Sequence, residues 1–160
     1  MLESKTCHGR QIIFAKMTKQ LKPKFYERSV IHLDQGDVMR GLKLTDSEFS
    51  CFGEVYISQI NKGSIKGWKV HHSATLNLLV AFGSVRFVVL TPEKNNSLFK
   101  SLDIEIGKNN HGLLQIPPGN WLAFGSLNGP ASIINVSNEI HNPEESSSSP
   151  FGLYQNYWDQ

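Results

Sequence analysis

Cysteine, unbalanced charge and long apolar runs are all scarce in this sequence of 160 residues. The two cysteines, Cys7 and Cys51, are too few for a disulfide framework and form no CxxC pair, so we expect ordinary thiols in a reducing, cytoplasmic setting. A net charge of +2 gives no electrostatic signature of nucleic-acid binding. The most apolar stretch, residues 76–90, is interrupted by Arg86 and is shorter than the roughly 20 residues that span a bilayer, so we expect no membrane segment.

The charge is distributed unevenly along the chain. Residues 1–28 carry seven basic and two acidic residues, a net charge of +5, whereas residues 29–160 carry nine basic and twelve acidic residues, a net charge of −3. We therefore predict a basic N-terminal extension over residues 1–28 and a single domain over residues 29–160 with an aromatic C-terminal tail. A short helix is expected near Ile12–Leu21, because Pro23 would end it.

From residue 29 onward, short apolar or alternating runs are separated by Gly, Asn, Pro and Ser. No long segment has a helical period, so the pattern favours an all-β sandwich or barrel. The expected strands are Ser29–Leu33, Gly41–Leu44, Glu54–Ile60, Gly67–His72, Leu76–Phe82, Val85–Leu90, Leu98–Ile106, Gly112–Ile116, Trp121–Ser126 and Ser132–Val136.

Several common catalytic motifs are missing. The sequence contains no Gly-rich phosphate loop, no GxSxG elbow and no HExxH zinc helix. His71 and His72 are sequence neighbours, so on a strand they point to opposite faces and cannot easily chelate one ion together. We therefore expect no metal site.

The motifs that are present lie in two regions. The first contains E-V-Y-I-S, G-S-I-K-G-W-K-V-H and T-L-N, at residues 54–58, 63–71 and 75–77. The second contains I-P-P-G-N-W at residues 116–121 and the acidic turn I-H-N-P-E-E at residues 140–145. This layout resembles the cupin superfamily and, among its metal-free members, the dTDP-4-dehydrorhamnose 3,5-epimerase family. The resemblance covers about residues 30–160.

That resemblance implies a fold and an activity. The fold would be a single-domain cupin double-stranded β-helix, or jelly roll. The activity would be cofactor-independent epimerisation of a dTDP-4-keto-6-deoxy sugar, or a similar nucleotide sugar, in the cytoplasm during cell-surface polysaccharide synthesis. The base would remove a proton from carbon next to the ketone. Small family members are similar to one another in forming homodimers, so a homodimer is implied, with no nucleic-acid or membrane partner.

Three positions depart from the family pattern. Lys69 stands where the K/R-G-x-H motif supplies the histidine base, Asn135 stands at about the place of the usual catalytic tyrosine, and Leu122 replaces a histidine that follows the P-x-G turn. The identity of the base therefore has to be argued from the residues themselves.

The candidate catalytic residues are His71 and Lys69, which share one face of a strand because they are two residues apart. Histidine ordinarily has a pKa of about 6.5 and suits a base at neutral pH. Lysine ordinarily has a pKa of about 10.4, so it needs burial to act as a base, but as a cation it can stabilise an enolate.

Four further residues are candidates for substrate binding. Lys66 aligns with the family's cation for the nucleotide diphosphate, and Tyr56, Asn77 and Asn135 could supply hydrogen bonds.

Other interpretations remain open at this point. His71 could be a core histidine, and Lys66 and Lys69 could be solvated strand or turn residues. The chain could be a catalytically degenerate cupin that binds a nucleotide sugar or a protein partner. It could also be a 3,4-ketoisomerase, which moves the keto group along the sugar ring.

Overall fold

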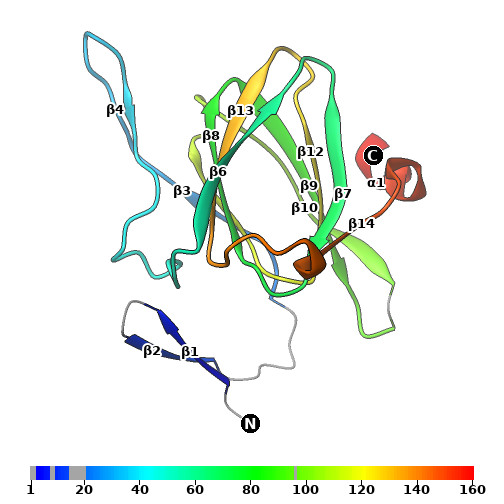
Figure 1. Cartoon of the computed structure of the whole chain (residues 1–160). Helices are drawn as coiled ribbons and strands as arrows, with labels where there is room; N and C mark the ends of the chain where they lie inside the picture. Colours follow the sequence, from blue (N-terminus) through cyan, green and yellow to red (C-terminus); the bar gives the residue numbers. More distant parts are fainter. Residues whose placement is uncertain (1–2, 8–9, 15–20, 96) are drawn as a thin grey trace.

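Two five-stranded antiparallel sheets face each other and form the body of the protein (Figure 1). The computed structural model describes residues 3–7, 10–14, 21–95 and 97–160, with side chains from residue 21 onward. The first sheet has the order β10 (Leu98–Gly107), β9 (Ser84–Pro92), β12 (Trp121–Gly125), β7 (Ile65–His71) and β14 (Ser146–Ser148). The second has the order β3 (Lys24–Glu27), β11 (Gly112–Ile116), β8 (Leu76–Phe82), β13 (Ala131–Ser137) and β6 (Glu54–Ile60).

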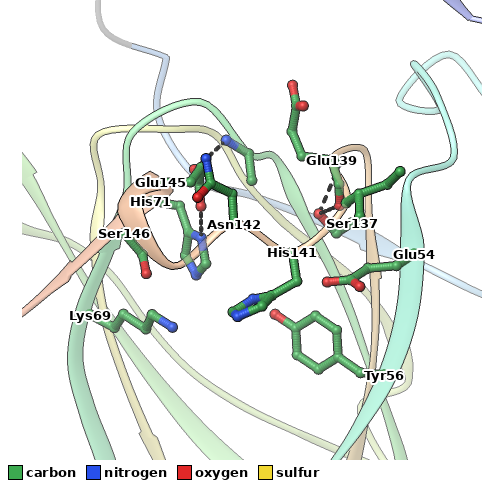
Figure 2. A pocket seen from close by; sticks show the side chains of 12 residues that line it. Glu54, Tyr56, Lys69, His71, Ser137, Glu139, His141, Asn142, Glu145 and Ser146 are labelled. Carbon is green, nitrogen blue, oxygen red and sulfur yellow. Dashed lines mark hydrogen bonds and ion pairs between the residues drawn. The ribbon is translucent and has the colours of Figure 1, made fainter.

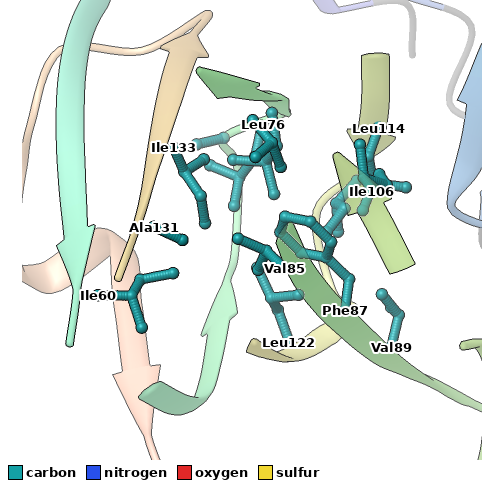
Figure 3. Close-up of a cluster of buried hydrophobic side chains, with 14 residues drawn as sticks. Ile60, Leu76, Val85, Phe87, Val89, Ile106, Leu114, Leu122, Ala131 and Ile133 are labelled. Atoms are coloured by element: carbon teal, nitrogen blue, oxygen red, sulfur yellow. The ribbon is translucent and has the colours of Figure 1, made fainter. Parts of the chain in front are cut away.

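The core lies between these sheets. Figure 3 shows Phe87 and Leu122 of the first sheet opposite Leu76 and Ile133 of the second. On β13, buried and half-buried residues alternate, as expected of a strand with one face on the core. The same alternation carries Asn135 to the inner face, so polar groups reach the space between the sheets.

A second apolar cluster covers the outer face of the first sheet. The C-terminal tail forms two short helical segments, η2 (Phe151–Tyr154) and α1 (Gln155–Asp159). Trp68 of β7 is fully buried under it, stacked on Phe151 with ring centroids 6.2 Å apart and in edge contact with Tyr154. The expected aromatic tail is therefore a docked segment that covers the back of β7.

An arm before β6 stands away from the two sheets. It contains the small hairpin β4 (Val30–Ile31) and β5 (Val38–Met39) (Figure 1). At the N-terminus, β1 (Glu3–Cys7) pairs with β2 (Arg10–Phe14). The last strand of the predicted extension, β3, pairs with β11, so these residues join the second sheet. Among the described residues, no helix is long and apolar enough to cross a bilayer.

The all-β jelly-roll prediction is confirmed, and most strands lie where the sequence placed them. Two local predictions are wrong. Part of the expected helix over Ile12–Leu21 is strand β2, since Ile12, Ile13 and Phe14 favour an extended chain, and residues 15–20 lie outside the described residues. Gly41–Leu44 is not a strand, because the Asp46 carboxylate accepts the Lys43 N–H at 2.9 Å and forms a turn instead.

The prediction for the cysteines also needs correction. Cys51 is disulfide-bonded, so it is not an ordinary thiol. The same prediction for Cys7 concerns a side chain outside the described part of the structure.

Candidate active site

A cavity opens between the two sheets, next to the inner face of β7. Tyr56, Lys69 and His71 line both its outer part, of about 410 Å³, and its deeper part, of about 210 Å³. The deeper part has an apolar floor, which excludes water and strengthens the electrostatic effect of any charge above it. The floor consists of Leu76, Leu78, Leu122, Phe124 and Ile133.

An irregularity in β7 brings three basic side chains to this cavity. The register with β12 pairs Lys69 with Leu122 and Lys66 with Phe124, so β7 contains one residue more than its partner over this stretch. This β-bulge puts Lys66 and Lys69 on the same side, although they are three residues apart. Gly67 permits it, because its φ is +140° and a Cβ there would lie 2.7 Å from Ala123.

His71 forms a short contact in the cavity wall. Its Nδ1 lies 2.6 Å from Oε2 of Glu145, which immediately precedes β14 (Figure 2). The second carboxylate oxygen, Oε1, accepts backbone N–H groups from Ala74 at 2.7 Å and Ser73 at 2.9 Å. Glu145 is therefore held by the turn after β7 as well as by the imidazole.

These contacts fix the protonation of the pair. Burial alone would raise the pKa of Glu145, but the N–H groups of Ala74 and Ser73 and the His71 imidazole outweigh it and lower that pKa to about 2. An ionised carboxylate only accepts hydrogen bonds, so Nδ1 of His71 must be the donor. In neutral His71 the lone pair is then on Nε2, at the opposite edge of the ring, where it can accept a proton.

The opposite wall carries a phenol and an amide. Tyr56 on β6 and Asn135 on β13 are register partners, and Asn135 Nδ2 donates to Tyr56 Oη at 2.5 Å. Burial raises the pKa of Tyr56, and the hydrogen bond from Asn135 offsets this only in part, so the phenol keeps its proton at neutral pH. Figure 2 shows Tyr56 facing His141 and Lys69 across the outer cavity.

Of the six residues that the sequence predicted for the site, five line the cavity. They are His71, Lys69, Lys66, Tyr56 and Asn135. The sixth, Asn77, lines neither part. Its Nδ2 donates to Val136 O at 3.0 Å, and its Oδ1 accepts from Gln115 Nε2 at 3.0 Å. Both ends of the amide are therefore hydrogen-bonded to neighbouring strands of the second sheet.

The residues of the site that were not predicted individually include Glu145 and His141, which can titrate. Glu145 and His141 belong to the acidic turn that supported the resemblance, but that turn lies some 70 residues from β7 in sequence and carries no signal of its contact with His71. Among the residues that the structure describes, there is no group of three or more His, Cys, Asp or Glu side chains arranged to hold a metal ion.

No family model matches the chain, and no curated protein matches its sequence. Solved structures do resemble it. A dTDP sugar isomerase from Desulfovibrio desulfuricans G20 is 29% identical, with a TM-score of 0.74 over 80% of this chain and 83% of that one.

Two further structures are more distant in sequence. A dTDP-6-deoxy-D-glucose-3,5-epimerase from Legionella pneumophila is 17% identical, with a TM-score of 0.68 over 79% of this chain and 71% of that one. A sugar 3,4-ketoisomerase from Thermoanaerobacterium thermosaccharolyticum is also 17% identical, with a TM-score of 0.64 over 86% and 93% of the two chains. The resemblance read from the motifs is thereby confirmed, and at low sequence identity the chain shares the cupin fold of the dTDP-4-dehydrorhamnose 3,5-epimerases and related sugar isomerases.

Proposed function

We propose that this protein is a cofactor-independent isomerase that epimerises a nucleotide-linked 4-keto-6-deoxy sugar. The observation that carries the proposal is the pair of His71 and ionised Glu145, 2.6 Å apart at the edge of a cavity that also contains two lysines. Structures that resemble the chain are epimerases and isomerases of dTDP sugars, which supports this class of substrate.

The proposed reaction begins with a proton transfer. His71 Nε2 removes the proton from carbon next to the ketone, and Glu145 stabilises the imidazolium that forms. The electron pair moves to the ketone oxygen and gives an enolate, whose negative charge Lys69 stabilises as a cation. A proton from solvent then adds to the other face of the same carbon and inverts the centre, and the His71 imidazolium releases its proton to solvent. Lys66, which also lines the cavity, is the residue that we propose to bind the diphosphate of the nucleotide.

Incubation with dTDP-4-keto-6-deoxy-D-glucose in deuterium oxide tests this reaction class, with the product identified by NMR. We expect deuterium at C3 or C5 with inversion there. A 3,4-ketoisomerase, the second candidate, is favoured by the similarity to such an enzyme and would instead place deuterium at C4 and move the ketone to C3. Binding without any exchange would contradict both and identify a degenerate cupin, in which case Lys69→His is the variant to test for a gain of exchange.

A homodimer is the second part of the proposal. Val55 and Ile57 of β6 are 53% and 65% exposed on the outer face of the second sheet, and Phe82 on the same face is 65% exposed. Leu33 and Leu44 in the arm are also exposed. Apolar groups of this size on a sheet face and on a projecting arm suit a contact with a second copy of the chain. On the resemblance to sugar-nucleotide enzymes, and not on the cysteines, we place this dimer in the cytoplasm, in the synthesis of cell-surface polysaccharide.

A further inference from the structure

The buried amide of Asn135 has one side-chain atom with no partner. Its side chain is 3% exposed and lines the deeper cavity. Nδ2 donates to Tyr56 Oη, whereas Oδ1 is buried with no hydrogen-bond partner among the described residues. Buried polar atoms are almost always hydrogen-bonded, so an orphaned acceptor on a cavity wall indicates a donor that arrives with a ligand.

The same hydrogen bond determines what Tyr56 can offer. Because Oη accepts from Asn135, the phenolic proton is directed elsewhere, and the structure gives this proton no acceptor among the described residues. Burial also raises the pKa of Tyr56, so the proton stays on the oxygen at neutral pH. The pair therefore presents one donor, the Tyr56 O–H, and one acceptor, Asn135 Oδ1, on the same wall.

A single hydroxyl group satisfies both atoms, since it accepts one hydrogen bond and donates another. We propose that Tyr56 and Asn135 together bind one ring hydroxyl of the ligand and make the site select hydroxylated over deoxygenated sugars. This inference rests on the proposed function for the class of ligand. A deoxygenated ring would leave Asn135 Oδ1 buried without a partner, which is how sites built around hydrogen bonds reject an analogue.

Calorimetric titration tests the proposal with dTDP, dTDP-6-deoxy-D-glucose and the 2-deoxy and 3-deoxy analogues of that sugar nucleotide. The wild-type protein is expected to bind one of the two analogues at least about tenfold more weakly than the parent compound. Tyr56→Phe is expected to reduce this discrimination to within about threefold while binding dTDP as the wild type does. Tyr26→Phe, which removes a phenol on β3 outside the cavity, is the matched control and should retain the discrimination.

The outcomes separate this inference from the proposed function. Failure of dTDP and its sugars to bind at all overturns both. Binding of dTDP with less than threefold discrimination against both analogues, or full discrimination in Tyr56→Phe, overturns only the hydroxyl assignment. Asn135→Leu provides a second variant, checked for folding by its thermal melt, and it too should lose the discrimination.

Discussion

The position of the proton on His71 depends on Glu145, because an ionised carboxylate at 2.6 Å accepts only from Nδ1–H and leaves Nε2 as the basic nitrogen. The alternation of a strand was enough to predict from the sequence that His71 and Lys69 share a face. Strand alternation could not predict the contact between His71 and Glu145, since these residues are 74 apart in the sequence. The position of Lys66 in the cavity could not be predicted from alternation either, because it depends on a β-bulge in β7.

Glu145→Gln should disable the proposed base without removing its side-chain volume. A neutral amide can donate as well as accept, so it no longer holds His71 in a single tautomer. We expect turnover to fall about 100-fold or more, and the ¹⁵N chemical shifts of His71 to change from an Nδ1–H tautomer to a mixture. Glu144→Gln, at the exposed neighbouring position, is the control and should leave both unchanged. An unaltered tautomer in Glu145→Gln would contradict the account.

Glu145 should also contribute to acid sensitivity. Its pKa in the folded protein, about 2, lies below its ordinary value of 4.5, so its contribution to stability is complete above about pH 4.5 and is lost as the pH falls toward 2. Urea unfolding at several pH values measures this contribution. The free energy of unfolding should decrease less between pH 5 and pH 3 in Glu145→Gln than in the wild type, and parallel curves would refute this prediction.

At the scale of elements, β7 has two roles. Its inner face carries Lys69 and His71, and its outer face carries Trp68 under the aromatic tail. Immediately before the tail, β14 pairs with β7 from His71 to Lys69, and Ser149 N donates to Trp68 O at 2.9 Å. The docked tail therefore positions Glu145, the residue before β14. The sequence indicated that these aromatics would dock, but not onto which face.

Trp158→Ala should loosen this tail and uncouple Glu145 from His71. Trp158 is 5% exposed and in edge contact with Phe151, so truncation should cost about 3–5 kcal/mol of stability. We also expect faster amide hydrogen exchange in β14 and lower turnover at a temperature where the variant remains folded. Leu153→Ala, in the same tail but 62% exposed, is the matched control. Unchanged exchange in β14 would show that the tail does not hold this strand.

At the scale of the molecule, the short alternating strands and the absence of helical periods were sufficient to predict two packed sheets. The arm could not be predicted, because residues 40–50 are held by side chains rather than by a strand ladder. Arg28 donates to Gly41 O at 2.9 Å and forms ion pairs with Asp46 and Glu48. The outer face that this arm leaves uncovered is the basis of the dimer proposal.

Ile57→Glu should convert the proposed dimer into a monomer. It places a charge in the middle of the apolar face, where burial against a second copy would remove its hydration. Light scattering after size-exclusion chromatography should give about twice the 18.0 kDa chain mass for the wild type and the single chain mass for the variant. Leu127→Glu, at an exposed turn position, should stay dimeric. A wild-type protein of single chain mass would overturn the dimer.

The most direct test of the account is the rate of solvent-deuterium exchange into dTDP-4-keto-6-deoxy-D-glucose by the wild type, His71→Ala and Lys69→Ala. The account predicts exchange next to the ketone by the wild type. It also predicts a loss of at least about 100-fold in His71→Ala, and a smaller loss in Lys69→Ala, because a cation that stabilises the enolate is not the group that removes the proton. Exchange by His71→Ala at the wild-type rate would contradict it.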